Sequence, residues 1–178
     1  KLWNAARFTL MNLEGYEPAE INVDQSPVED RWLLSRLATV TQQATDGLDR
    51  FKFAEVARLL YDFAWNEFCS FYVEIAKPRL ADDASRAMTQ NVMAHGLDTL
   101  LRLLHPFMPF VTESIWGFLG ELAPKRGLTP KPVTSFVMKA DWPESNSAHF
   151  DETIERQFAE FQEVVGAIRR IRASQSIA

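Results

Sequence analysis

Apolar residues are densest between Lys52 and Pro78, where their spacing is that of a helix. At roughly 100° per residue, nine apolar side chains fall within one broad arc of the helical cylinder. They are Phe53, Val56, Ala57, Leu60, Phe63, Ala64, Phe68, Phe71 and Ile75. Tyr61, Trp65 and Tyr72 widen this arc to about half of the cylinder. Because a surface helix needs a narrower apolar stripe, the pattern predicts the central helix of a bundle. The positive charge of Lys77 is favourable at the C-terminal end of this helix, and Pro78 is expected to stop the helix.

The segments on either side predict further helices. The first covers Leu2 to about Leu13, and the second begins at a capping box, Ser26-Pro27-Val28-Glu29, and ends near Gly47. The inward side chains expected for the second helix are Trp32, Leu33, Leu37, Val40 and Ala44. Downstream, Asp82 or Asp83 is expected to cap a helix that stops at His105-Pro106. A short helix through Ile115, Trp116 and Leu119 then ends at Gly120.

We therefore expect an all-α protein, a bundle of about five or six helices over residues 1–120. Residues 121–150 contain several prolines and are expected to form an irregular connection, with a brief extended segment from Ser135 to Lys139. A last helix is expected over 151–173, with Ile154, Phe158, Phe161, Val165 and Ile168 on one face, and 174–178 look like a truncated lead-out. The chain begins at Lys1 in helical register, which suggests a piece of a longer protein.

Composition limits the classes of function. With 47% hydrophobic and 12% aromatic residues, 178 residues can bury a substantial core, and no apolar run is long enough to cross a membrane. The single cysteine, Cys69, excludes an internal disulfide and suits a reducing cytoplasm; we expect a half-buried structural thiol. The net charge of −5 argues weakly against nucleic-acid binding, although acids crowd one connecting segment and arginines gather near the end.

Residue types that carry catalysis are not clustered in this sequence. His95, His105 and His149 have no spaced thiol or carboxylate partner, and the seven glycines form no phosphate-binding loop. We expect His105 to make a hydrogen bond in its turn. Glu67 and Glu74 resemble a carboxylate pair, but ion pairs with arginines of a neighbouring helix are the favoured interpretation. We thus expect no catalytic residue, no cofactor-binding residue and no metal ligand in this chain.

The first helix carries the side chains best suited to RNA. At roughly 100° per residue, Leu2, Trp3, Ala6, Leu10 and Leu13 share an expected core face, opposite Lys1, Asn4, Arg7, Phe8 and Met11. An exposed Phe8 could stack an unpaired base, while Asn4 and Arg7 could contact base edges or phosphates. The alternative is that another helix covers this face and Phe8 belongs to the core. Arg169 and Arg172 present neighbouring donors, although arginines at a helix end also complement the macrodipole.

Four motifs in a fixed order resemble a known family. They are KLWNAARF from Lys1, DRWLLSRL from Asp30, LYDFAWNEFCSFYVEIAKPRL from Leu60, and LLRLLHPFMPFVTESIW from Leu100. Together they closely resemble the anticodon-binding helical domain of valyl-tRNA synthetases, which are class I aminoacyl-tRNA synthetases. DRW and HPFMPF also occur in the isoleucine and leucine relatives, whereas WNEFCSFYVE with KP, and RLLHPFMPFVTE, look specifically valyl. The resemblance covers essentially the whole chain.

The resemblance implies recognition of the anticodon loop of valine tRNA, with Asn4, Arg7 and Phe8 in the matching motif and Arg169 and Arg172 as secondary candidates. It implies a cytoplasmic parent enzyme that requires ATP and Mg²⁺ for aminoacylation. The catalytic and editing domains and the C-terminal coiled-coil arm of that family are absent from this chain, so its partners would be tRNA and other domains of the parent. The alternatives are the same domain of an isoleucyl-type synthetase and a helical protein-interaction module.

Overall fold

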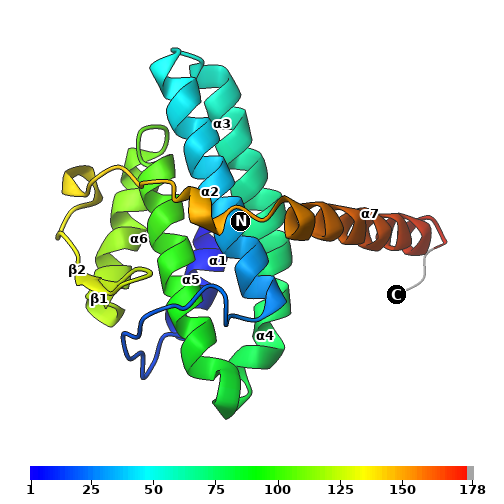
Figure 1. Ribbon diagram of the computed structural model, residues 1–178, viewed down its shortest axis with the longest axis horizontal. Helices are drawn as coiled ribbons and strands as arrows, with labels where there is room; N and C mark the ends of the chain where they lie inside the picture. Colours follow the sequence, from blue (N-terminus) through cyan, green and yellow to red (C-terminus); the bar gives the residue numbers. More distant parts are fainter. Residues whose placement is uncertain (176–178) are drawn as a thin grey trace.

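The computed structural model of the protein describes residues 1–175, and the last part of the expected lead-out, 176–178, lies outside them. Its α-helices are α1 (Leu2–Met11), α2 (Val28–Asp49), α3 (Phe53–Asp62), α4 (Val73–Leu80), α5 (Asp83–Leu104), α6 (Pro109–Leu122) and α7 (Glu152–Ser174). The π-helix η1 (Phe63–Tyr72), the 3-10 helices η2 (Val137–Lys139) and η3 (Ser147–His149), and the strands β1 (Lys125–Arg126) and β2 (Lys131–Pro132) complete the described elements. The expected all-α bundle is confirmed (Figure 1).

The predicted central helix exists as one continuous rod in which α3, η1 and α4 follow without a break. Its middle is π-helical, so backbone bonds reach five residues back, and the Ser70 hydroxyl also donates to the Trp65 carbonyl at 2.6 Å. Pro78 does not stop the rod, because the missing N–H affects only its last turn and Leu80, 3% exposed, still packs in the core. The prediction of a stop at Pro78 was wrong.

The apolar arc of the rod is buried along its lower part and exposed near its start. Phe63 and Phe71 are 1% and 8% exposed, as predicted, and Leu100 and Leu104 of α5 are buried as well. Phe53 and Tyr61, by contrast, are mostly exposed. Figure 1 gives the reason: α2 and α3 extend as a pair beyond the other helices, so only one neighbour covers this end of α3.

The second helix has the predicted core face but a different start. Its inward residues Trp32, Leu33, Leu37, Val40 and Ala44 are all buried. The predicted capping box is absent: Pro27 is the N-cap, and the Ser26 hydroxyl donates backwards to the Asn22 carbonyl at 2.7 Å. At the start of α5 the expectation was right, because the Asp82 side chain accepts from the Ala84 N–H.

The connection between α6 and α7 wraps the bundle and is pinned to it by tryptophans. Trp116 donates to the Thr134 carbonyl and Trp142 to the Thr45 hydroxyl, each at 2.8 Å. Strands β1 and β2 form a two-stranded antiparallel hairpin. The expected extended segment at Ser135–Lys139 was wrong, since η2 occupies most of it.

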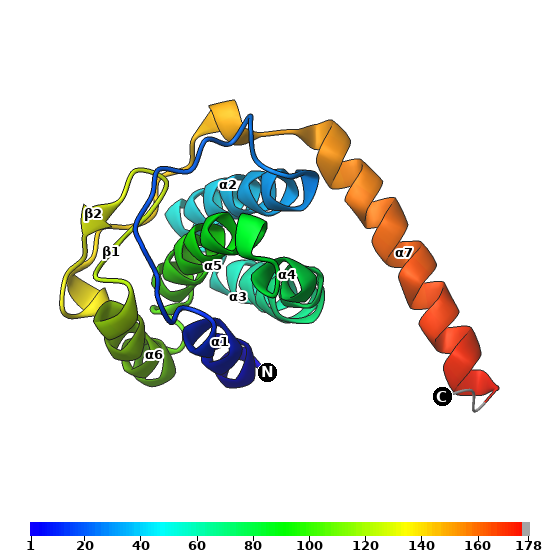
Figure 2. The same ribbon diagram turned by 90° about the horizontal axis from the view of Figure 1, so that it is seen from below.

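Helix α7 leaves the bundle soon after it begins. Ile154 is buried and Phe158 packs against the core, whereas Phe161, Ile168 and Ile171 are all more than half exposed. Both views show α7 projecting away beside α4 (Figures 1 and 2). Its expected apolar face therefore contacts the bundle only through its first turns.

Candidate nucleic-acid interface

Helix α1 is rotated from its predicted orientation. Its buried face consists of Ala5, Ala6 and Thr9, small side chains that permit a close approach to α5. Trp3, predicted to be core, is 48% exposed and packs edge-on against Phe118 of α6, with ring centroids 6.4 Å apart. That part of the prediction was wrong. The small side chains of α1 face the core, whereas a large apolar one, Trp3, is partly exposed beside them.

The structure places Asn4 and Arg7 on the outer face of α1, where both are exposed. Phe8 lies at the edge of that face: it is half-buried and packs against the core, which is intermediate between the exposed ring and the core ring that the sequence left open. A ring in this position is held by the bundle and still presents part of its surface to solvent. Asn4, Arg7 and Phe8 thus remain neighbours on one side of α1.

A residue that sequence analysis did not include joins this group from α4. The ammonium of Lys77 lies 5.5 Å from the centroid of the Phe8 ring, close enough for a cation–π contact. It also donates to both carboxylate oxygens of Glu74 at 2.7 Å, so the predicted pairing of Glu74 with an arginine was wrong. The spacing of Glu74 and Lys77 indicates their ion pair, but no local pattern predicts the contact with Phe8.

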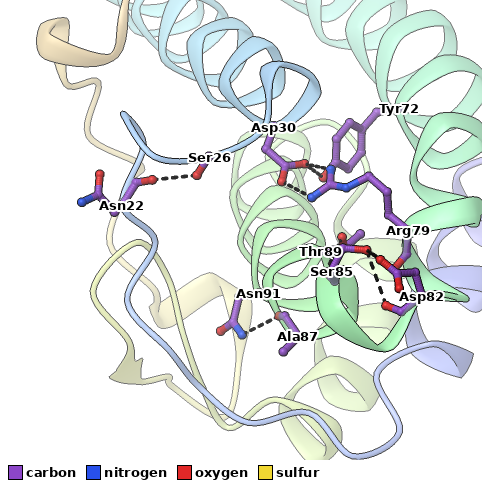
Figure 3. Close-up of polar contacts among 10 residues, drawn as sticks. All are labelled: Asn22, Ser26, Asp30, Tyr72, Arg79, Asp82, Ser85, Ala87, Thr89 and Asn91. Atoms are coloured by element: carbon purple, nitrogen blue, oxygen red, sulfur yellow. Dashed lines mark hydrogen bonds and ion pairs between the residues drawn. The ribbon is translucent and has the colours of Figure 1, made fainter.

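The end of α4 that carries Lys77 is held by a buried ion pair (Figure 3). Asp30, at the start of α2, is fully buried and accepts bonds of 2.6 Å from Nη1 and Nη2 of Arg79. The Tyr72 hydroxyl donates to the same carboxylate at 2.7 Å, and burial together with the charge of Asp30 raises the pKa of Tyr72 well above its ordinary value. This contact fixes α4 against α2 and so fixes the position of Lys77.

The base of α7 is held by a second polar cluster centred on Arg36. Arg36 donates to both oxygens of Glu67, at 2.7 and 2.9 Å, and to Glu155 of α7 at 2.8 Å. Burial disfavours the charge of Arg36, but its bonds to the two carboxylates outweigh burial and raise its pKa. Glu67 therefore has the arginine partner that the sequence predicted. Stacking of Phe158 on Trp32, with centroids 5.0 Å apart, completes the attachment.

Arg169 and Arg172 are exposed on the projecting part of α7, with Arg172 in the last turn. This end of α7 stands apart from α1 in both views (Figures 1 and 2). The structure therefore presents two separate groups of candidates, one around Asn4, Arg7, Phe8 and Lys77 and one on α7.

The remaining polar residues point to structural roles. His105 Nδ1 lies 2.8 Å from the Thr112 hydroxyl, which confirms the expected hydrogen bond. Cys69 is half-buried, as expected, and burial raises its pKa to about 11. Among residues 1–175, no group of three or more His, Cys, Asp or Glu side chains is placed to hold a metal ion. None of the helices within the described part of the chain is long and apolar enough to span a membrane.

Comparison with known proteins adds information that geometry does not provide. A family model described as the anticodon-binding domain of tRNA ligase matches residues 30–178. The chain is 64% identical to a valine–tRNA ligase of Rhodopirellula baltica, 42% to one of Carboxydothermus hydrogenoformans and 38% to one of Thermotoga maritima. These alignments cover 99–100% of this chain but only 17–19% of the relatives. Helix α1 lies outside the family match and inside the alignments with these relatives.

Proposed function

Because the chain belongs to the anticodon-binding domain family of tRNA ligases, we propose that it recognises the anticodon loop of valine tRNA within a longer valine–tRNA ligase. The names of the relatives support the choice of valine over isoleucine. In this proposal the domain holds one end of the tRNA while a catalytic part of the ligase, outside this chain, joins valine to the other end. Binding of ATP and Mg²⁺ belongs to that part, and the complete ligase works in the cytoplasm.

The observation that carries the proposal is the group on α1 and α4. Asn4 and Arg7 are exposed side by side, and the half-buried ring of Phe8 has Lys77 over it. Unpaired bases are bound by stacking on rings and by hydrogen bonds to their edges, and phosphates by cations. The four side chains supply a ring, an amide and two cations. Arg169 and Arg172 would contact the tRNA backbone as a second group.

A helical protein-interaction module, the alternative from another class, would use an apolar surface without cations. The outer face of α1 instead combines Arg7 with Asn4, and Lys77 adjoins it. This chemistry favours RNA for that face. The acidic net charge of −5 belongs to the chain as a whole and does not describe this group.

The test uses the complete ligase with Phe8→Ala and Arg7→Ala. We expect Phe8→Ala to remove a stacking contact of about 1–3 kcal/mol and to weaken the use of valine tRNA. Activation of valine without tRNA should remain normal. Arg7→Ala should weaken binding and lower the slope of log K against log salt by about 1 if it contacts phosphate.

Two matched variants control for loss of a ring or a charge elsewhere. Phe136→Ala removes a half-exposed ring from the α6–α7 connection, and Arg58→Ala removes a highly exposed arginine from α3. Both should charge tRNA as the unmodified ligase does. Each variant is compared on tRNAs with native and altered anticodons. If Phe8→Ala and Arg7→Ala charge both tRNAs as the unmodified ligase does, this face does not bind the anticodon loop.

A further inference from the structure

The starts of α1 and α6 and one side of the central rod enclose an apolar groove with a volume of about 440 Å³. Its principal side chains are Trp3, Tyr61, Trp65, Phe107, Met108 and Val111. The one charged residue in its lining is Lys1. A groove of this size and chemistry can accept several apolar side chains, but it offers few partners for polar groups.

The rim of this groove is unusually apolar for a surface in contact with water. Tyr61 is 54% exposed, Trp3 48% and Met108 43%, and all three line the groove. The row continues along α3 to Phe53 at intervals of four residues, through Ala57. Contiguous apolar surface of this kind marks a site where another protein segment packs.

The position of Lys1 identifies what would occupy the groove. Its ammonium donates to the Ser70 hydroxyl at 2.9 Å and lies 4.5 Å from the centroid of the Trp65 ring, so Lys1 itself forms part of the wall. This chain accounts for 17–19% of the length of the relatives named above, so most of such a ligase lies outside it. Any polypeptide joined to Lys1 starts at the groove and has a very high effective concentration there.

We propose that the groove is the docking site of the polypeptide segment that leads into Lys1 in the longer ligase. The inference rests on the proposal that the chain works within such a ligase. The segment presents apolar side chains to Tyr61 and Met108, and its packing fixes the angle at which the bundle meets the rest of the ligase. RNA suits this surface poorly, because a single cation cannot compensate several phosphates.

Oxidative footprinting of the complete ligase in the absence of tRNA tests this inference. Hydroxyl radicals oxidise exposed Met, Tyr and Trp side chains, and mass spectrometry of peptides gives a rate for each position. Met138 in η2 is the internal reference, because it is 72% exposed and lies outside the groove lining. If the groove were open, the exposures of Met138 and Met108 would make their rates differ by less than about twofold. We expect Met108 to react at least tenfold more slowly than Met138.

A variant tests whether protection of the groove depends on apolar packing of the segment. Met108→Glu places a carboxylate in the apolar groove at an exposed position and should release the segment, so that oxidation of Tyr61 increases at least threefold. Met138→Glu, the matched control, should leave the rate at Tyr61 unchanged. The inference is overturned if Met108 reacts within twofold of Met138, or if Met108→Glu does not change Tyr61.

Two further outcomes would assign the groove to another occupant and would also overturn the inference. Protection that depends on ligase concentration would indicate a second copy of the chain. Protection that appears only when tRNA is added would indicate RNA. Because the expected protection is measured without tRNA, it can be present in a ligase whose Phe8 and Arg7 variants charge tRNA normally. Failure of the docking inference and failure of the anticodon proposal are thus distinguishable.

Discussion

Neutralising Asp30 should destabilise the protein strongly. The Asp30 carboxylate is fully buried and accepts three bonds of 2.6–2.7 Å from Tyr72 and Arg79. In Asp30→Asn, the single amide oxygen cannot satisfy all three donors, and the guanidinium of Arg79 loses its counter-charge. Breaking one partner of a buried ion pair costs about 3–5 kcal/mol. Since the Arg79 side chain keeps 15% exposure, we expect the lower end, about 3 kcal/mol.

Urea unfolding followed by tryptophan fluorescence and circular dichroism measures this loss. In a chain of this size, 1 kcal/mol corresponds to about 2–4 °C in Tm, so Asp30→Asn should lower Tm by about 6–12 °C. Tyr72→Phe removes one bond to a charged acceptor and should cost about 2 kcal/mol. The helical content at 20 °C should stay the same in both variants.

A double variant tests the reasoning behind these numbers. Asp30→Asn with Arg79→Met removes both charges, so its loss of stability should be at least 1 kcal/mol smaller than the sum of the two single losses. A loss below about 1 kcal/mol for Asp30→Asn alone would refute the argument, since that value is typical of an exposed ion pair. Simple additivity in the double variant would refute it as well.

Three further outcomes are expected. Phe71→Ala should cost about 3–5 kcal/mol in urea unfolding, because the ring is 8% exposed and packs edge-on against Trp32; a cost below 1 kcal/mol would contradict this packing. Burial lowers the pKa of His95 from 6.5 to about 4, so between pH 6.5 and pH 4 the unfolded chain binds more protons than the folded protein. The free energy of unfolding should therefore fall by up to about 3 kcal/mol as the pH drops from 6.5 to 4. His95→Gln should flatten that pH profile, and an unchanged profile would show that other groups cause it. Phe51→Gly should raise the free energy of unfolding by up to about 1 kcal/mol, since Phe51 is 79% exposed at a φ of 58°, and a lower stability would mean that the ring makes an important contact.

Helical periodicity was enough to predict the main helices and the core of α2. Trp32, Leu37 and Ala44 are buried because α2 keeps a regular 100° step against its neighbours. The same step also predicted the burial of Phe63 and Phe71, although η1 advances by a different angle per residue. It fails near the start of the rod, where Phe53 is mostly exposed because only α2 covers that end of α3. A sequence pattern indicates that a segment is helical, but it does not show where bonds reach five residues back.

The candidate site was predictable only within α1. The exposure of Asn4 and Arg7 follows from their position on the helix, and both lie where the sequence predicted. The sequence left the burial of Phe8 open, because a short helix with large residues on several faces has no unique inward direction. The contact of Lys77 with Phe8 joins residues far apart in the chain, so only the packing of α4 against α1 reveals it.

Because α7 is attached to the bundle near its start, a small tilt there produces a large displacement of its far end. The helix has 23 residues, about 34 Å at 1.5 Å per residue, and the cluster of Arg36, Glu67 and Glu155 grips it in its first turn. Over an arm of about 25 Å from Glu155 to Arg172, a tilt of only 5° at the base displaces the far end by about 2 Å. A change of one hydrogen bond at Glu155 could thus move Arg169 and Arg172 by a distance comparable to the length of a phosphate contact, without altering either arginine. The geometry of the outermost charges is set at the opposite end of the helix.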